Sequence, residues 1–122
     1  MAGDAILSDD EVRASTCRLE TIGRRTGQPR QLPIWFAVRG RTVFLLSGGG
    51  DAAHWVRNLR ADPRARLRIR RRWLAGTARE TAGTPDDALA REAMAAKYDL
   101  KRGGPFQTWL DTSLVVAIDL SE

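Results

Sequence analysis

Hydrophobic and polar positions alternate near the start of the chain in a way that is typical of strands. Cys17, Leu19 and Thr21 alternate with polar residues, which indicates a strand with one buried face. A turn with glycine at both ends follows at residues 23–27, and an extended run resumes over residues 29–38. Two extended segments around a short loop that contains glycine predict a β-hairpin.

The pattern then changes from strands to a helix. After a tight turn at residues 39–41, the apolar run 42–46 predicts a short, fully buried strand. The glycine-rich segment 47–51 interrupts the sheet, and we expect a short helix from about residue 51 to residue 61. Pro63 ends this helix, since proline cannot continue one.

A row of arginines follows. Over residues 65–73, apolar side chains alternate with Arg66, Arg68 and Arg70, which predicts a strand with these arginines on one face. The row is either a solvated face of a sheet or, with Trp73, a surface that binds nucleic acid by phosphate contact and base stacking.

The remaining elements complete a mainly β pattern. A turn near Ala75 and Gly76 is expected to lead into a further strand through Glu80. The strongest helix signal covers residues 84–98, where a threonine, a proline and two aspartates stand at the start. Residues 114–120 predict a closing strand. About six short strands with few helices favour a small antiparallel barrel.

Length and composition indicate a soluble globular protein of one domain. The chain has 122 residues, of which 43% are hydrophobic and 29% are charged. We expect residues 1–12 to form a short acidic leader and residues 13–122 a single barrel domain. Ser8 and Glu11 have the spacing of a capping box, so the leader either opens one helical turn or stays loose. No signal-peptide pattern or long apolar run is found, which favours a cytoplasmic location without an integral membrane segment.

The positive charge is concentrated in the middle of the chain. Residues 13–79 hold 16 arginines against three acidic residues, a net of +13, although the whole chain carries only +5. Such a body favours an anionic partner, which could be nucleic acid, a membrane surface or a phosphorylated small molecule. Arginine suits phosphate and carboxylate recognition because its guanidinium is planar and forked.

Several kinds of catalytic site are excluded by the scarcity of the residues they need. Cys17 and His54 are the only cysteine and the only histidine, so we expect no disulfide and no metal site. A Cys–His nucleophile would need these two side chains to meet. The paired aspartates stand at probable helix starts, where capping explains them. An enzyme with this sequence would therefore depend on a bound cofactor for its chemistry.

Three segments could hold such a cofactor. The first is the turn 23–27 with the following Arg30, where glycines admit a ligand and guanidinium groups attract anions. The second is the loop 47–50 before a helix start. The third is the segment 54–58, which carries a ring, a cation and an amide. The alternatives are a solvated hairpin tip, a flexible connection and a helix with core anchors.

The order of these motifs resembles that of the deazaflavin (F420)-dependent nitroreductase family. The hairpin motif TIGRRTGQPR, the loop LSGGG and the helix motif WVRNLRADP each have a counterpart in that family. The resemblance covers about residues 19–120 and depends on motifs at residues 21–30, 46–50, 55–63, 77–80, 106–109 and 115–120.

The resemblance implies a split β-barrel, like the pyridoxamine-phosphate-oxidase-like, FMN-binding split barrels. It implies an oxidoreductase that transfers a hydride from reduced F420 to a small electron-poor acceptor, which could be a quinone, an activated alkene or a nitro compound. No nucleic acid partner is expected of such an enzyme. A homodimer and peripheral contact with a membrane are compatible with it. The alternatives are an FMN-binding oxidoreductase, a protein that binds F420 without turnover and a basic barrel that binds nucleic acid.

The same resemblance implies roles for individual residues. The phosphate and oligoglutamate tail of F420 would be held by Arg24, Arg25, Thr26 and Arg30. The deazaflavin site would be lined by Gln31, Leu32, Pro33, Ile34 and Trp35. The ring system or the acceptor would meet Ser47 and Gly48, and the chain beside the ring would lie against His54, Trp55, Val56, Arg57 and Asn58.

The sequence departs from the family at the acceptor side. The family often has lysine where Gly48 stands, and two family tyrosines fall near Gly103 and Phe106. The candidate catalytic residues that remain are Ser47, which could polarise an acceptor oxygen by hydrogen bonding, and Tyr98, which is the only tyrosine. We therefore expect a different acceptor pocket.

Overall fold

A computed structural model of the chain describes residues 6–121. The strands are β1 (Cys17–Ile22), β2 (Pro29–Ile34), β3 (Ala37–Arg39), β4 (Thr42–Ser47), β5 (Arg64–Ile69), β6 (Arg72–Glu80) and β7 (Leu114–Leu120). The helices are α1 (Asp9–Val12), the 3-10 turn η1 (Gly50–Ala52), α2 (His54–Ala61), α3 (Pro85–Lys97) and α4 (Gln107–Thr112). The fold is therefore mainly β, as the sequence predicts.

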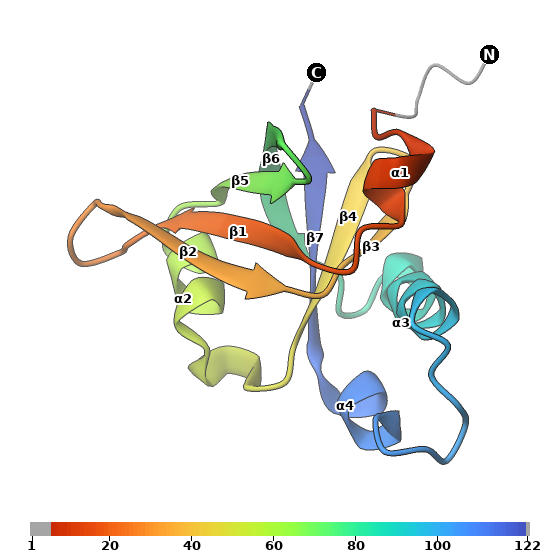
Figure 1. The fold of residues 1–122 in the computed structure, drawn as a ribbon. Helices are drawn as coiled ribbons and strands as arrows, with labels where there is room; N and C mark the ends of the chain where they lie inside the picture. Colours follow the sequence, from red (N-terminus) through yellow and green to blue (C-terminus); the bar gives the residue numbers. More distant parts are fainter. Residues whose placement is uncertain (1–5, 122) are drawn as a thin grey trace.

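All strand pairs are antiparallel, and the sheet has the order β2-β1-β5-β6-β7-β4-β3. The two edge strands, β2 and β3, are consecutive in the chain and are separated only by Trp35 and Phe36. Because so short a link must join opposite edges, the sheet curls until the edges meet at one corner (Figure 1). The result is an open, curled half-barrel, which confirms the predicted barrel class.

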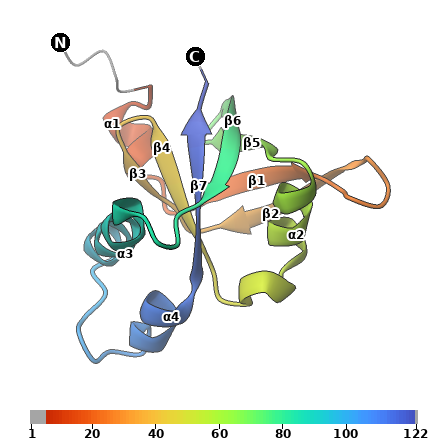
Figure 2. The same ribbon diagram turned by 180° about the vertical axis from the view of Figure 1, so that it is seen from behind.

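The curled sheet is packed on both sides of β4. Val43 and Leu45 face the core inside the curl, whereas Phe44 and Leu46 pack with Met94 of α3 in a second cluster outside it. A strand buried on both faces needs apolar residues at every position, which explains the unbroken run in the sequence. Helices α3 and α4 lie together on this outer side (Figure 2).

Helix α2 closes one end of the half-barrel. It places Trp55, Val56 and Leu59 in the inner core. The predicted helix 51–61 is therefore confirmed, although its first residues form the separate turn η1. This packing fixes α2 beside the β1–β2 hairpin (Figure 1).

The end of α3 holds the corner where the sheet edges meet. Phe36 is fully buried, and its backbone N–H donates to the Tyr98 hydroxyl over 3.1 Å. Lys97 donates from Nζ to the Phe36 carbonyl at 2.8 Å and lies over the Phe36 ring, 3.4 Å from its centroid. Burial lowers the pKa of Lys97 to about 8.

The predicted turn at Ala75 and Gly76 is wrong, because β6 continues without interruption through both residues. The chain turns earlier, at Arg70, which has a positive φ of 58°. A side chain on Gly76 would lie 2.6 Å from Ile118 Cγ2 and 2.8 Å from the Asp119 carbonyl oxygen. This glycine therefore marks a close approach of β6 to β7 and not a turn.

Two further differences concern element boundaries. The extended run 29–38 is broken by the corner at Trp35, so seven strands form instead of six. Helix α4 was not predicted, since it is only six residues long and Phe106, which precedes it, provides no side-chain cap. A helix so short and uncapped depends on its packing against α3, which single-sequence patterns do not show.

Residues 6–12 are packed on the barrel and are not loose. The capping box is confirmed: Ser8 Oγ accepts from the Glu11 N–H at 3.1 Å, and the Ser8 N–H donates to Glu11 Oε1 at 2.9 Å. Leu7 is buried in the inner core, and Glu11 binds Arg72 at 2.7 Å. The first five residues of the expected leader lie outside the described residues.

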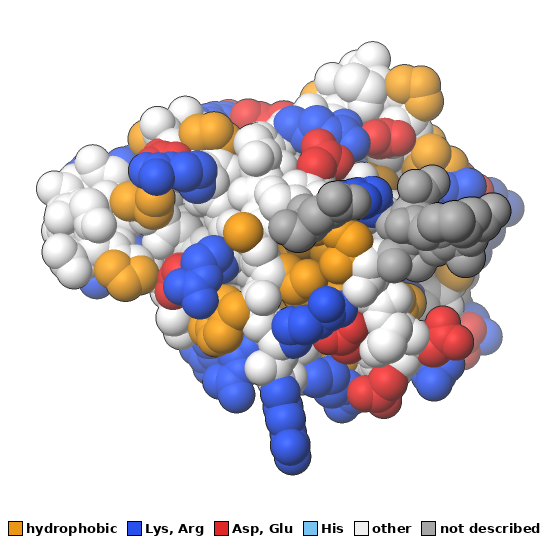
Figure 3. Space-filling view, turned by 90° about the horizontal axis from the view of Figure 1, so that it is seen from above, with side chains coloured by type: hydrophobic (Ala, Val, Ile, Leu, Met, Phe, Trp, Pro, Cys, Tyr) orange, Lys and Arg blue, Asp and Glu red, His pale blue; other side chains and the backbone are white. Residues whose placement is uncertain are grey.

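Many arginines of the basic body, residues 13–79, form ion pairs with carboxylates at the surface. Basic and acidic side chains lie against one another there (Figure 3). The pairs are Arg60 with Asp51 and Glu80, Arg64 with Asp62, Arg66 with Glu20, Arg70 with Asp10, Arg72 with Glu11, and Arg79 with Asp86 and Asp119. Outside the basic body, Arg91 pairs with Asp87. Exposed pairs contribute little to stability, but they reduce the positive charge available to an anionic ligand. From residue 6 to residue 121, no helix combines the length and apolar character needed to cross a membrane.

Candidate functional site

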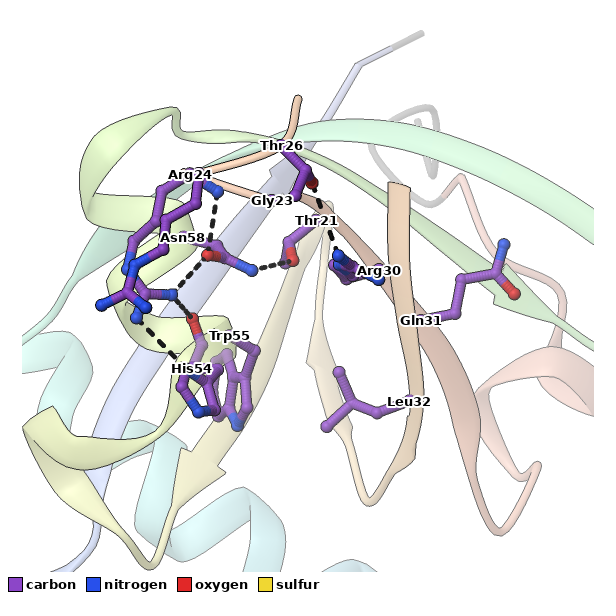
Figure 4. A pocket seen from close by; sticks show the side chains of 11 residues that line it. Thr21, Gly23, Arg24, Thr26, Arg30, Gln31, Leu32, His54, Trp55 and Asn58 are labelled. Carbon is purple, nitrogen blue, oxygen red and sulfur yellow. Dashed lines mark hydrogen bonds between the residues drawn. The ribbon is translucent and has the colours of Figure 1, made fainter. Parts of the chain in front are cut away.

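A pocket of about 450 Å³ lies between the β1–β2 hairpin and α2 (Figure 4). It brings together many of the residues that the sequence motifs predict, although they come from segments about 30 positions apart. Its lining is Thr21, Gly23, Arg24, Arg25, Thr26, Arg30, Gln31, Leu32, His54, Trp55 and Asn58. Gly23 belongs to the turn 23–27 that the sequence predicts as a cofactor segment, whereas Thr21, which precedes this turn in the hairpin motif, was not predicted as a site residue.

The hairpin turn is tight and needs its glycines. The Gly23 N–H donates to the Gln28 carbonyl at 2.8 Å, and the Gly27 N–H donates to the Gly23 carbonyl at 2.8 Å. Gly27 has a φ of +71°, and a side chain on Gly23 would lie 2.8 Å from Thr26 Oγ1. The glycines thus let the turn fold back and place Thr26 beside Arg30, which donates to its hydroxyl over 3.5 Å.

A buried asparagine ties this hairpin to α2. Asn58 Oδ1 accepts from the Arg24 backbone N–H at 3.2 Å and from Arg24 Nη1 at 2.7 Å. Asn58 Nδ2 donates to Thr21 Oγ1 at 3.1 Å, so every polar atom of the buried amide side chain is used. Figure 4 shows Arg24 folded over Asn58 toward His54.

The same arginine fixes the tautomer of the single histidine. Arg24 Nη2 lies 3.2 Å from His54 Nδ1. Because a guanidinium nitrogen can only donate, Nδ1 must accept and the imidazole proton must sit on Nε2. His54 is exposed at the pocket rim, so this N–H faces toward a ligand or solvent.

The pocket carries positive charge without local compensation. Within residues 6–121, no carboxylate lies within 4.0 Å of the guanidinium groups of Arg24, Arg25 or Arg30. This contrasts with the paired arginines of the surface described above. Three guanidinium groups around one pocket form a site for phosphate or carboxylate groups.

A second pocket, of about 440 Å³, continues along β2 from the first. Residues 30–32 line the basic pocket and residues 33–35 line this one. Its full lining is Pro33, Ile34, Trp35, Leu46, Phe106 and Trp109. Leu46, Phe106 and Trp109 were not predicted as site residues, and the last two are placed by the unpredicted helix α4.

The second pocket is walled by aromatic rings. The Trp35 centroid lies 5.5 Å from that of Phe106 and 5.7 Å from that of Trp109, with the Trp109 ring edge-on at 84°. None of the lining side chains is charged, and their only polar groups are the indole N–H groups of Trp35 and Trp109. Such a surface suits a flat, uncharged ligand.

Ser47 and Gly48 lie next to the aromatic pocket but do not line it. Ser47 is buried at the end of β4, where its hydroxyl donates to the Gly50 carbonyl at 3.1 Å. A side chain on Gly48 would lie 3.1 Å from Trp109 Cδ1, so the indole packs directly against this glycine. That contact explains a glycine at a position where the resembling family often has lysine.

Tyr98, the other candidate catalytic residue, lines neither pocket. Its hydroxyl donates to the Ser15 carbonyl at 2.8 Å and accepts from the Phe36 N–H. Its ring stacks on Trp35, and burial raises the pKa of its phenol. A direct catalytic role for Tyr98 stays a prediction, and this geometry connects it to the site only through Trp35.

Two predicted cofactor residues on α2 point away from both pockets. Val56 is buried in the inner core, and Arg57 is exposed and donates to the Asp51 carbonyl at 2.9 Å. Cys17 is buried as well, and this burial raises the pKa of its thiol to about 12, so it stays protonated and a poor nucleophile at neutral pH. Within the described range, no three His, Cys, Asp or Glu side chains are grouped to hold a metal ion.

Solved structures with low sequence identity share this fold. A conserved hypothetical protein from Mycobacterium tuberculosis is 20% identical, with a TM-score of 0.73 over 98% of this chain and 84% of that one. The F420-H2 dependent reductase FDR-A is 20% identical, with a TM-score of 0.68 over 85% of this chain and 93% of that one. A protein from Listeria innocua assigned as a pyridoxamine 5′-phosphate oxidase is 13% identical, with a TM-score of 0.68 over 93% and 89%. The fold is thus the split barrel of the pyridoxamine-phosphate-oxidase-like proteins.

Sequence comparison gives the family. The model of the F420H(2)-dependent quinone reductase family matches residues 11–121, which is nearly the whole chain. This match confirms F420 over FMN as the cofactor and a quinone-type compound as the acceptor. The chain belongs to the F420H(2)-dependent quinone reductase family, and it is an oxidoreductase that uses the reduced deazaflavin F420.

Proposed function

We propose that the two pockets along β2 form one groove, with the anionic tail of F420 at the basic end and its ring toward the aromatic end. The observation that carries this proposal is the charge and shape of the groove. Three arginines without a carboxylate partner in the described residues line one end, and an uncharged aromatic pocket adjoins it on the same strand. A cofactor with a flat ring and an anionic tail matches both ends.

At the basic end, Arg25 and Arg30 supply the guanidinium groups that face the tail. Both are exposed, and neither is held by a carboxylate in the described part of the chain. Arg24 has a double role, because its side chain donates to Asn58 and lies beside His54 Nδ1 while its charge has no carboxylate partner in the described residues. Thr26 fixes the turn and offers its hydroxyl beside Arg30.

At the aromatic end, the residues orient the reactants and exclude water. When bound, F420 supplies the hydride, so the protein needs no nucleophile of its own. Trp35 and Trp109 form two walls at right angles that would confine a flat acceptor. An uncharged quinone fits this lining better than a charged acceptor, whose desolvation here would not be compensated.

Ser47 is the proposed donor to the acceptor oxygen. Its hydroxyl is bonded to the Gly50 carbonyl, so it must rotate away from this bond to reach a ligand. Such a donor stabilises the negative charge that develops on a carbonyl oxygen as hydride arrives. The indole N–H of Trp109, which unlike Ser47 lines the aromatic pocket, is a second candidate donor.

A fluorescence titration with F420 tests the basic end. Substitution R25Q or R30Q should weaken F420 binding by about tenfold or more, the effect of losing one charge-assisted contact of about 1.4 kcal/mol. The matched control is R71Q, which removes an equal charge from an exposed arginine in the β5–β6 turn. An equal loss in R71Q, or no saturable F420 binding by the unaltered protein, would overturn the assignment.

Steady-state kinetics with a soluble quinone tests the aromatic end. Substitution W109A should raise the KM for the quinone and leave the Kd for F420 near its original value. Substitution S47A should lower kcat with little change in the quinone KM or the F420 Kd. The Ser47 hydroxyl contacts the acceptor oxygen only as negative charge develops on it. If W109A weakens F420 and quinone binding equally, the division of the groove is wrong.

A further inference from the structure

Arginines occupy every second position from the start of β5 to the first residue of β6, and all but one of them pair with a carboxylate. Arg64, Arg66, Arg68, Arg70 and Arg72 alternate along this segment. Four of these five have an acidic partner: Arg64 with Asp62 at 2.7 Å, Arg66 with Glu20 at 3.2 Å, Arg70 with Asp10 at 3.2 Å and Arg72 with Glu11 at 2.7 Å. Arg68 has no such partner among residues 6–121.

Arg68 faces another arginine instead. In the antiparallel pair of β1 and β5, Arg68 stands directly opposite Arg18, and both side chains are exposed on the outer face of the sheet. Within the described chain, Arg18 also has no carboxylate within 4.0 Å. Like charges directly opposite each other across two strands are destabilising unless an anion lies between them.

A pocket of about 280 Å³ forms around this pair. It is lined by Ala14, Ser15, Thr16, Arg18, Arg68 and Arg70, so its lining residues carry two hydroxyls, three guanidinium groups and no carboxylate. Asp10 engages Arg70 from outside the lining, through its carboxylate and its carbonyl oxygen. The pocket shares no residue with the groove along β2.

We propose that this pocket is a second anion site, in which Arg18 and Arg68 together bind one phosphate group. Two forked guanidinium groups from directly opposite positions of adjacent strands can both donate to the oxygens of one tetrahedral anion. The hydroxyls of Ser15 and Thr16 supply further donors from the segment before β1. The phosphate can belong to a soluble phosphorylated compound or to the headgroup of a phospholipid.

NMR of the full-length, ¹⁵N-labelled protein tests the site directly. Inorganic phosphate is titrated at constant ionic strength while the Nε–Hε signals of the arginines are followed. We expect saturable shifts at Arg18 and Arg68, and an affinity about tenfold lower in R18Q or R68Q. The signals of Arg25 and Arg30 report on the cofactor groove separately, so the proposals for the two sites can be rejected independently.

The control variant is R71Q, because Arg71 is an exposed arginine near the site that does not line it. It should change phosphate affinity by less than about twofold, a purely long-range effect. Equal weakening by R71Q and R68Q, or Arg18 and Arg68 signals that do not saturate, would overturn the proposal.

The thermal stability of R68Q, measured with and without phosphate, distinguishes an anion-binding role of Arg68 from a merely structural one. In dilute buffer without phosphate, R68Q should be more stable than the unaltered protein, because it removes the repulsion of Arg18. Added phosphate should reverse this order by stabilising only the protein that retains both arginines. Stability of R68Q below that of the unaltered protein under both conditions would contradict the proposal.

Vesicle sedimentation then distinguishes the two sources of phosphate. Binding to phosphatidylcholine vesicles that contain phosphatidylglycerol, lost in R18Q and R68Q and retained in R71Q, would assign the site to a lipid headgroup. No difference between these variants, together with the NMR result above, would assign it to a soluble phosphorylated ligand.

Discussion

The ring of Tyr98 lies parallel to the indole of Trp35, with centroids 4.2 Å apart and an angle of 12° between the planes. Its hydroxyl is tied to backbone atoms of Phe36 and Ser15, at the corner where the two sheet edges meet. Trp35 in turn lines the aromatic pocket. Tyr98 therefore contacts both the corner of the barrel and a wall of the aromatic pocket, and we expect it to act as a positioning residue for that wall.

Substitution Y98F separates the role of the Tyr98 hydroxyl at the barrel corner from the role of its ring against Trp35. It keeps the stacked ring but leaves the buried Phe36 N–H without its acceptor, which should cost about 1–3 kcal/mol in the free energy of unfolding. Denaturant unfolding measures this loss. The KM for a quinone should change little, since the ring that supports Trp35 remains.

Substitution Y98L is the matched comparison, because it removes both the hydroxyl and the ring. It should raise the quinone KM as well as lower stability, since Trp35 loses its stacking partner. If Y98F instead abolishes kcat while KM and stability are retained, Tyr98 is catalytic after all and the positioning role is wrong.

Substitution of Asn58 by aspartate tests the importance of positive charge in the groove, because it changes the charge without changing the size of the side chain. In N58D, a carboxylate of the same size would meet Arg24, which now binds the neutral Oδ1 at 2.7 Å. A buried negative charge there would neutralise part of the basic end and weaken F420 binding by about tenfold or more. F420 fluorescence titration measures the effect.

The matching variant is N58A, which removes the hydrogen bonds to Thr21 and Arg24. It should destabilise the protein by about 1–3 kcal/mol, because buried groups lose their partners. N58D should remain folded, since its carboxylate still accepts from Arg24. Unchanged F420 affinity in folded N58D would show that Arg24 contributes no charge to the cofactor.

The basic half of the site could be predicted from sequence because it is built from local motifs. The hairpin 21–30 and the helix segment 54–58 each have a recognisable pattern, and the structure places them around one pocket. The contact that joins them, Arg24 with Asn58, spans 34 positions and leaves no local pattern. The motif order suggested a common site, but only the fold shows how the segments meet.

The aromatic half could not be predicted in the same way. Its walls include Phe106 and Trp109, which project from a six-residue helix without a capping side chain. Ser47 and Gly48 were expected to meet the ring system or the acceptor, which stays a prediction. In the structure, the Ser47 hydroxyl donates to the Gly50 carbonyl and Trp109 packs against Gly48. Side-chain packing between distant segments decides these positions.

A glycine in a sequence can mark either a turn or a close approach of two strands, and Gly76 marks the second. The sequence suggested a turn, whereas the structure shows a strand position pressed against Ile118 and Asp119. Substitution G76A should lower the free energy of unfolding by about 1–3 kcal/mol, because the added methyl forces β6 away from β7. Denaturant unfolding measures it.

The control is A75S, a small change at the exposed neighbouring position of β6. It should alter stability by less than about 0.5 kcal/mol, as do most surface substitutions. Equal stability of G76A and the unaltered protein would mean that β6 and β7 are not in this close register.

The ion pair of Glu11 with Arg72 predicts how stability depends on pH. Hydrogen bonds from the Arg72 guanidinium, and then from the Ser8 backbone N–H, lower the pKa of Glu11 to about 2. Its pKa in the unfolded chain is about 4.3. Because the folded value is the lower one, the pair stabilises the protein fully above the unfolded value, and this stabilisation is lost as pH falls toward about 2.

Comparison of the unaltered protein with E11Q isolates this contribution. The difference in free energy of unfolding should be constant from neutral pH down to about 5 and should shrink steadily below that. The matched variant is D10N, which alters the adjacent carboxylate of α1, whose side chain is 73% exposed. We expect D10N to change stability less than E11Q at neutral pH, since its ion pair with Arg70 is open to solvent. A gap between the unaltered protein and E11Q that does not narrow on acidification would show that α1 is held to the barrel by Leu7 and its apolar neighbours, and not by the Glu11 carboxylate.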